Sequence, residues 1–232
     1  MTNLAARLQQ GIDELSLNID QPTQQKLIQY IELIAKWNKS FNLTAIRNID
    51  EMLTLHLLDS LAVVPYIKAD RILDVGAGAG LPGIVLALCY PEKEFVLIDT
   101  NGKKTRFMTQ AKIELGLSNV EVVHARVDEY GVDKTNNDEK GPLKPFDAII
   151  SRAFASISDM LGYVGHLVTT DASMKTKILA MKGDGEEEIS QMPEQYQKTY
   201  QIDHIHELDV PGLQAKRQLV VLSAKGLTEE NE

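Results

Sequence analysis

The sequence contains a single cysteine, Cys89, among its 232 residues. One cysteine excludes an intramolecular disulfide. It lies in the apolar stretch IVLALCY, which we interpret as a helix face buried in the core rather than the setting of a reactive thiol. This cysteine usage is typical of proteins kept in a reducing compartment, so we expect a cytoplasmic protein.

Long hydrophobic runs are also absent. No apolar stretch approaches the roughly 20 residues that span a bilayer. The N-terminal residues MTNLAARLQQGIDELSL show neither the basic region nor the continuous apolar region of a secretory signal. Hydrophobic residues make up 44% of the chain and charged residues 25%, which are ordinary values for a globular protein. The length suits one α/β domain with an appendage, or two small domains.

Positive charge is scarce. The chain has 24 Lys and Arg against 33 Asp and Glu, a net charge of −9, and its pI is about 5.1. This balance argues against general affinity for nucleic acid, because neutralising phosphates requires lysine and arginine. It leaves room for a local basic patch on an acidic body.

Residues 1–68 have the pattern of helices. Pro22 stands near one helix start, and the following Leu27, Ile31 and Ile34 share one face. Asn48, with Glu51 three residues on, resembles a capping box, and we expect Pro65 to end or kink that helix. We divide the chain into a helical extension (1–68) packing on a catalytic domain (69–226), and an acidic tail (227–232).

From Arg71 the pattern changes to short apolar strands separated by helical stretches. Such alternation predicts βαβ units and a parallel sheet covered on both faces. Near the end, residues 198–210 and 214–226 leave no room for a crossover helix, so they predict an antiparallel pair closing the sheet. Residues 131–145 form a polar connection. The expected fold is therefore α/β, with a mostly parallel sheet and an antiparallel C-terminal strand pair.

The stretch RILDVGAGAGLPG (71–83) places glycines where the first strand ends. Gly78, Gly80 and Gly83 match the dinucleotide fingerprint, with Asp99 at the distance of a ribose-binding carboxylate. The alternating Gly76-x-Gly78-x-Gly80, preceded by Asp74, instead favours S-adenosylmethionine (SAM). Such a loop brings the ligand against bare backbone, where a Cβ would collide. Asp74 would orient the ammonium group of SAM, and Asp99 would bind both ribose hydroxyls.

Later strands add candidates for the same crevice. After the third strand, Val127 is placed to cover an adenine face, and Asp128 is placed to accept a hydrogen bond from the adenine amino group. A solvated acidic turn explains Asp128 as well. Arg152 ends the fourth strand. Ligands of open α/β sheets bind beyond the carboxyl ends of the strands, so these residues should meet Asp74 and Asp99 there.

Several segments together resemble one family. WNKSFNLTAI, HLLDSL, ILDVGAGAGLPGI, VDEY, SRAFAS and MKG occur in order over nearly the whole chain and are similar to the RsmG (GidB) family of bacterial 16S rRNA guanine-N7 methyltransferases. The resemblance implies a Rossmann-like class I fold, SAM as methyl donor, and guanine 527 in the 530 loop of the small ribosomal subunit as substrate. It also implies SAM contacts at Gly76, Leu81, Val127, Asp128 and Arg152.

The chemistry needs little from the protein beyond positioning. Guanine N7 carries an in-plane lone pair and needs no deprotonation to attack a sulfonium methyl group, so we expect no general base. Arg152 and Lys182 are predicted to position the substrate by holding O6 or flanking phosphates. A bidentate arginine across O6 and N7 would block the reaction, so the grip must be one-sided.

Other motifs favour structural interpretations. His56, Asp59 and Ser60 share a helix face, and three residues on one short arc cannot surround a carbonyl as a hydrolase triad does. His204 and His206 lack a third ligand nearby, so we predict no metal site. Near the end of the chain, Lys216 and Arg217 fit a phosphate contact and a solvated edge equally well.

Three other functions stay open at this point. They are an NAD-dependent oxidoreductase, a SAM-dependent methyltransferase acting on a small molecule or a protein, and a SAM-binding module without turnover. The acidity of the chain favours the second. For the rRNA methyltransferase we expect 16S rRNA or the small subunit as partner, no membrane association, and a monomer.

Overall fold

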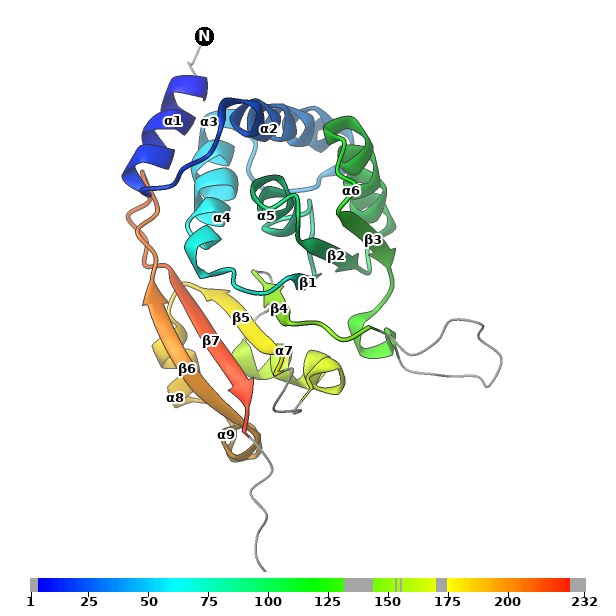
Figure 1. Ribbon diagram of the computed structural model, residues 1–232, viewed down its shortest axis with the longest axis vertical. Coiled ribbons are helices and arrows are strands. Elements are labelled where there is room, and N and C mark those ends of the chain that lie inside the picture. The colour runs from blue at the N-terminus through cyan, green and yellow to red at the C-terminus, as the bar shows by residue number, and fades with distance from the viewer. Residues whose placement is uncertain (1–3, 132–143, 153, 155, 170–174, 226–232) are drawn as a thin grey trace, which may run out of the picture.

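The centre of the fold is a single sheet, seen in a computed structural model that describes residues 4–131, 144–152, 154, 156–169 and 175–225. In the described residues it has seven strands in the order β3-β2-β1-β4-β5-β7-β6 (Figure 1). The strands are β1 (Arg71–Val75), β2 (Glu94–Asp99), β3 (Val120–His124), β4 (Ala148–Ser151), β5 (Lys177–Lys182), β6 (Tyr200–Glu207) and β7 (Gln218–Ala224). Most of the 131–145 connection and all of the 227–232 tail lie outside the described ranges.

The first five strands are parallel, and β7 pairs antiparallel with both β5 and β6. The expected mostly parallel sheet with an antiparallel C-terminal pair is therefore confirmed. The strand order reverses between β1 and β4, and open α/β sheets bind ligands at such a switch point. The register of β5 and β7 pairs Lys182 with Gln218, so the start of β7 lies at the carboxyl edge of the parallel strands.

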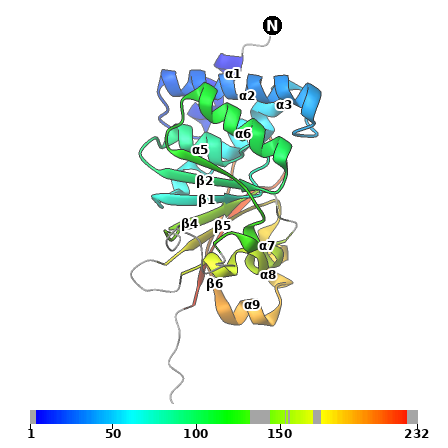
Figure 2. The same cartoon turned by 90° about the vertical axis from the view of Figure 1, so that its right-hand side faces the viewer.

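Helices cover both faces of the sheet (Figure 2). One layer combines the N-terminal helices with the helices that follow β1 and β2, and the other follows β4 and β5. The first layer holds α1 (Leu4–Glu14), α2 (Gln21–Phe41), α3 (Ile49–Met52), α4 (Asp59–Leu61), α5 (Gly83–Cys89) and α6 (Gly102–Leu115). The second holds α7 (Ile157–Val164), α8 (Gly185–Ser190) and α9 (Glu194–Thr199). No helix of the described chain is long and apolar enough to cross a membrane.

The N-terminal helices share one core with the sheet. The larger buried cluster unites Leu27, Ile31 and Ile34 of α2 with Ile84 of α5 and Leu97 of β2. All five side chains are fully buried, each contributing about 1.5–3 kcal/mol of transfer free energy. The predicted apolar face of α2 is thus confirmed. The division of the chain at residue 68 stays a prediction.

Local signals explain where the second helix begins. The Asp20 side chain accepts a hydrogen bond from the Thr23 amide at 2.9 Å, and Pro22 occupies the first turn, where its missing N–H costs nothing. At the next helix, Asn48 caps as predicted, but its side chain accepts from the Asp50 amide at 2.8 Å. In a capping box the bond would reach the amide of Glu51, three residues on, so this cap differs from the predicted one.

The third helix contains a segment that the sequence pattern did not indicate. After α3, residues Leu53–Leu58 form a π-helix, and the α-helical hydrogen bonding resumes in α4. The regular helix ends at Leu61, and Pro65 lies in the following 3-10 turn, Val64–Tyr66, as expected for a helix-ending proline. A π segment widens the helix and frees backbone carbonyls for other partners.

Candidate active site

The glycine loop after β1 follows an unusual backbone path. Gly76, Gly78 and Gly80 have φ angles of +66°, +63° and +88°, in the left-handed region. Only glycine adopts this region without strain, which explains why the glycines alternate. Helix α2 contacts the loop, because the Tyr30 hydroxyl donates a hydrogen bond to the Ala79 carbonyl at 2.6 Å. The N-terminal helices thus fix the shape of the predicted cofactor loop.

Gly80 and Gly83 are required for packing. A Cβ on Gly80 would lie 2.5 Å from the Ile84 side chain. A Cβ on Gly83 would lie 2.6 Å from Asp74 Oδ2 and 2.9 Å from Leu97 Cγ. Gly83 is therefore small because Asp74 and β2 press against it, and a bound pyrophosphate is not needed to explain it.

Asp74 is fully buried beneath the loop. Its Oδ2 accepts from the Gly83 amide at 2.8 Å, whereas Oδ1 has no hydrogen-bond partner within the described chain. Burial raises the pKa of this carboxyl to about 7. A buried acceptor without a donor is costly, and a ligand ammonium group would satisfy it. The site thus fits the amino end of SAM.

Asp99 closes the other side of the loop at the end of β2. Its carboxylate accepts from the Gly78 amide at 2.9 Å and from the Asn101 amide at 2.8 Å. The ammonium of Lys104 lies 3.9 Å from Oδ2. A carboxylate offers about four lone-pair positions, so acceptors remain for the two ribose hydroxyls.

A cavity of about 400 Å³ opens beside Asp99, at the carboxyl ends of the first three strands. It is lined by four of the predicted cofactor residues, Gly76, Asp99, Val127 and Asp128, and by the rings of Phe154 and Tyr163. Its volume is in the usual range for small-molecule sites. Of the four residues predicted to meet in one crevice, Asp99 and Asp128 line this cavity, whereas Asp74 and Arg152 do not.

The other predicted contacts have different surroundings. Asp128 receives two hydrogen bonds from Arg126, at 3.1 and 2.8 Å, and this pairing lowers the pKa of Asp128. If Asp128 accepts a hydrogen bond from an adenine amino group, its carboxylate binds that amino group and the Arg126 guanidinium at the same time. Leu81 is buried in the core and does not line the cavity, and its backbone amide donates to the Ala77 carbonyl.

Arg152 turns toward the N-terminal helices. Its Nη1 donates to the Leu55 carbonyl at 3.0 Å, in the π segment, and to Asp59 Oδ2 at 3.1 Å. The other oxygen of Asp59 accepts from Nε of Arg217 at 3.0 Å. One buried carboxylate therefore joins β4, α4 and the start of β7.

His56 belongs to the same structural cluster. Its ring nitrogens lie 3.1 Å from the Leu55 carbonyl and 3.2 Å from Thr44 Oγ1, in the NLTAI segment. Burial lowers the pKa of His56 to about 4, and the charge of Arg152 acts in the same direction. The imidazole is thus neutral near pH 7. The interpretation of this helix face as structural explains His56, but it missed the charged partners of Asp59.

Lys182 is buried on the opposite face of the sheet. Its ammonium pairs with Glu188 of α8 at 3.0 Å and donates to the Phe154 carbonyl at 2.9 Å. The structure does not bring it into contact with Arg152. Its role toward the substrate base stays a prediction, and the geometry shows that it supports the segment after β4. No group of metal-ligating side chains occurs in the described residues.

A model of the family described as rRNA small subunit methyltransferase G, or GidB, matches residues 23–221. The chain belongs to this family. A ribosomal RNA small subunit methyltransferase G of Pseudomonas aeruginosa is 46% identical over 94% of both chains. The protein of that name from a Marinomonas species is 44% identical over 94% of this chain and 97% of its own. The resemblance drawn from the sequence is confirmed.

Solved structures support the fold. A ribosomal protein L11 methylase from Lactobacillus delbrueckii has a TM-score of 0.52 at 15% identity, covering 77% of this chain and 80% of its own. TrmK of M. capricolum, solved with S-adenosylhomocysteine, has a TM-score of 0.51 at 13% identity over 75% and 70%. The Rossmann-like methyltransferase fold is confirmed, and family membership makes the chain a SAM-dependent methyltransferase. The individual site residues stay predictions.

The loop allows a test with a matched glycine. A Cβ on Gly78 would meet nothing closer than 3.9 Å, and Gly116, at the end of α6, has a similar φ of +67° in open space. Each alanine variant should lose about 1–2 kcal/mol of stability from backbone strain alone. Only Gly78→Ala should also lose SAM affinity, because only its methyl group would lie in the predicted cofactor loop. Calorimetric titration would contradict this placement if both variants bound SAM like the wild type.

The state of Asp74 predicts a pH-dependent affinity for SAM. Below pH 7 the carboxyl is protonated and lacks the charge that attracts an ammonium group. At pH 6 the affinity for SAM should therefore be about tenfold lower than its highest value. It should be highest between about pH 7 and 8, because the ammonium group of free SAM loses its proton at higher pH. Asp74→Asn should bind more weakly, with a flat profile below about pH 7. Titrations in buffers of different ionisation enthalpy measure the linked proton release, and zero release at pH 6 would refute the assignment.

Proposed function

We propose that this chain transfers the methyl group of SAM to N7 of guanine 527 in the 16S rRNA of the small ribosomal subunit. The observation that carries this is the family match over residues 23–221, which includes both the cofactor loop and the N-terminal segments that hold Arg152. The position and the atom that is methylated come from the family resemblance.

The site is suited to methylating a ring nitrogen. When bound, SAM supplies an electrophilic methyl group, and the N7 lone pair attacks it without loss of a proton. The protein therefore has to orient the two partners. In the described cluster around Arg152, His56 is buried and neutral and makes two structural contacts, so it has no basic role to fill.

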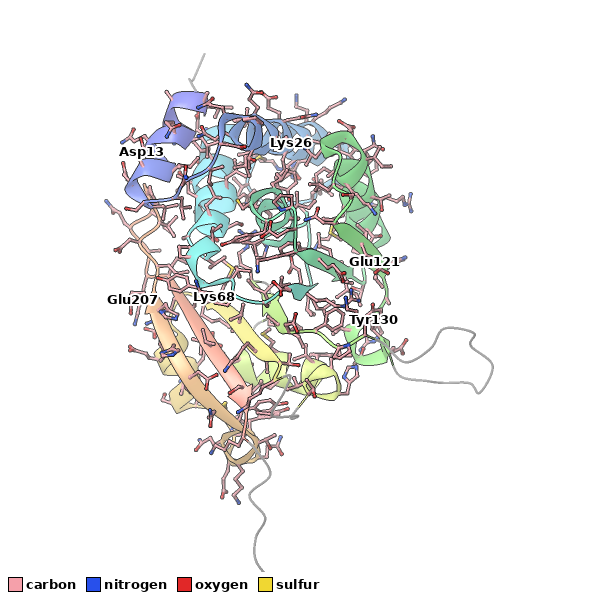
Figure 3. All side chains as sticks on the ribbon, viewed as in Figure 1. Asp13, Lys26, Lys68, Glu121, Tyr130 and Glu207 are labelled. Carbon is pink, nitrogen blue, oxygen red and sulfur yellow. The ribbon has the colours of Figure 1, made fainter. Side chains whose placement is uncertain are left out.

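The surroundings of the protein follow from the same proposal. A substrate in the ribosome and a single cysteine fit the cytoplasm, and we expect the chain to act there as a monomer. Burial raises the pKa of the Cys89 thiol to about 12, and its partly buried side chain packs against the core at the end of α5. The outer side of the helical layer carries charges of both signs, such as Asp13 and Lys26 (Figure 3), as expected of a surface in water.

The direct test is methyl transfer from labelled SAM to defined acceptors. Purified protein is incubated with small subunits lacking the modification, with naked 16S rRNA, with large subunits as the matched control, and with cell extract. We expect label in the small subunit, and strand scission after borohydride and aniline treatment should locate an N7-methylguanine at position 527. If only a protein or a small molecule becomes labelled, the proposal is contradicted, and the chain is a methyltransferase that acts on another substrate.

The absence of a general base gives a second expectation. With saturating SAM and bound RNA, single-turnover methyl transfer should vary little between about pH 6 and 8. His56 does not titrate in this window, because its pKa is about 4. Bound ammonium should hold Asp74 ionised, so its titration affects cofactor affinity only. A steep bell-shaped profile under these conditions would show a base that the geometry does not contain.

A further inference from the structure

Asp74 and Arg152 carry opposite charges near the ends of neighbouring strands. Strands β1 and β4 pair in register at Asp74 and Ile150. Next along the chain, the Ser151 hydroxyl donates to the Val75 carbonyl at 2.7 Å, and Arg152 follows directly. The carboxyl and the guanidinium therefore belong to one end of the sheet, at the switch point where ligands of this fold bind.

The two charged groups are not joined by a salt bridge. Oδ1 of Asp74 has no hydrogen-bond partner within the described chain. Nη1 of Arg152 donates instead to Asp59 Oδ2 at 3.1 Å and to the Leu55 carbonyl at 3.0 Å. No hydrogen bond of Nη2 of this arginine occurs among the described residues. A free acceptor on Asp74 and free N–H groups on Arg152 thus remain at the same end of the sheet.

The two charges nevertheless interact. Burial raises the pKa of Asp74 to about 7, while the Gly83 amide and the positive charge of Arg152 act in the opposite direction. The charge of Asp99 adds to the rise. Burial also raises the pKa of the Tyr30 hydroxyl, on which Arg152 and Asp74 have opposite effects. Direct pairing with Arg152 would hold the pKa of Asp74 low, so the raised value agrees with a guanidinium that is near the carboxyl but separate from it.

A separated pair of opposite charges is complementary to a zwitterion. The amino-acid end of SAM carries an ammonium group and a carboxylate on the same carbon atom, so it needs an acceptor and a donor close together. The Asp74 carboxylate offers the acceptor, and the planar guanidinium of Arg152 matches the geometry of a carboxylate. If these two side chains were paired with each other, SAM would have to break their salt bridge before it could bind.

We propose that Asp59 is a positioning residue that keeps Arg152 apart from Asp74, so that both remain free to bind the amino-acid end of SAM. This inference rests on the SAM site of the proposed function and does not depend on the methyl acceptor. Asp59 itself touches no cofactor, because its side chain is only 3% exposed and both of its oxygens are occupied. The Leu55 carbonyl, in the π segment, gives Arg152 its second anchor.

Arg217, directly before β7, holds the Asp59 carboxylate from the other side. Its Nε donates to Oδ1 of Asp59 at 3.0 Å, whereas Arg152 binds Oδ2. Because each arginine has an oxygen of its own, removal of Arg217 leaves the contact between Asp59 and Arg152 in place. Arg217→Ala therefore disturbs the cluster without releasing Arg152.

The test measures affinity for SAM and for methylthioadenosine, which contains the adenosine part but no amino-acid end. In calorimetry at about pH 7.5, Asp59→Asn and Arg152→Gln should each bind SAM about tenfold more weakly or worse, the effect of a lost hydrogen bond to a charged group. Both should bind methylthioadenosine like the wild type. Arg217→Ala should bind both ligands like the wild type. The matched control is Asp203→Asn, which breaks a partly buried ion pair with Lys177 at the start of β5 and should also leave both affinities unchanged.

The pH dependence separates a released Arg152 from a general loss of structure. In Asp59→Asn the guanidinium is free to pair with Asp74, which lowers the pKa of that carboxyl and keeps it ionised at pH 6. The drop in SAM affinity between about pH 7.5 and 6 should therefore shrink to less than about threefold. Arg152→Gln removes the positive charge, so the pKa of Asp74 should rise and the drop should be at least as large as in the wild type.

The proposal is overturned if Asp59→Asn binds SAM like Asp203→Asn, or if it loses affinity for SAM and for methylthioadenosine equally. It is also overturned if Arg152→Gln binds SAM like the wild type. Should Asp59→Asn fail to fold, as judged by thermal unfolding, the wild type decides. Its Asp74 carboxyl signal in ¹³C NMR, assigned with Asp74→Asn, should titrate near pH 7 without SAM. A midpoint below about 4 would show that Arg152 already pairs with Asp74 and would refute the proposal.

The outcome is independent of methyl transfer. If these variants behave as expected but the wild type methylates no guanine N7, the role of Asp59 is retained and the proposed function is refuted. If the wild type methylates the guanine and Asp59→Asn is indistinguishable from Asp203→Asn, the role of Asp59 alone is refuted.

Discussion

The left-handed backbone of the glycine loop is the constraint on which the rest of the site depends. Three positive φ angles in five residues bring bare backbone to the strand ends, and no cluster of ordinary side chains can replace it. Within the loop, the amides of Gly80 and Leu81 donate to the Ala77 carbonyl, and side chains supply the remaining support. Tyr30 from α2, Asp99 from β2 and Asp74 from β1 fix it from three sides. The cofactor site is therefore the product of two structural layers rather than of one loop.

Three buried carboxylates illustrate how surroundings decide the role of a residue type. Asp99 is satisfied by backbone amides and keeps acceptors for a ligand. Asp74 lacks a partner on one oxygen, and burial raises its pKa to about 7. Asp59 is paired on both oxygens with cations that reach the edge of the fold. Asp99 thus supports the loop, Asp74 offers a free acceptor to a positive group, and Asp59 holds two arginines in place.

The sequence predicted those features whose causes are local. Short apolar runs predicted the strands, and alternating glycines indicated a loop that offers bare backbone to a ligand, because both follow from the properties of single residues. Contacts between residues far apart in the sequence could not be predicted. Asp59 meets Arg152 and Arg217 over separations of 93 and 158 residues, so helical spacing showed only its neighbours His56 and Ser60. The π segment and the pairing of Lys182 with Glu188 were hidden for the same reason.

The position of β7 has a consequence for how the chain is made. It is the last described strand in the sequence, yet it lies between β5 and β6 and pairs with both. During synthesis from the N-terminus, β5 therefore presents an open edge until residues 218–224 emerge, and β6 has no partner in the sheet. Completion of the sheet therefore waits for the last of its described strands. Because Arg217 directly precedes this strand, its ion pair with Asp59 forms only at the same moment.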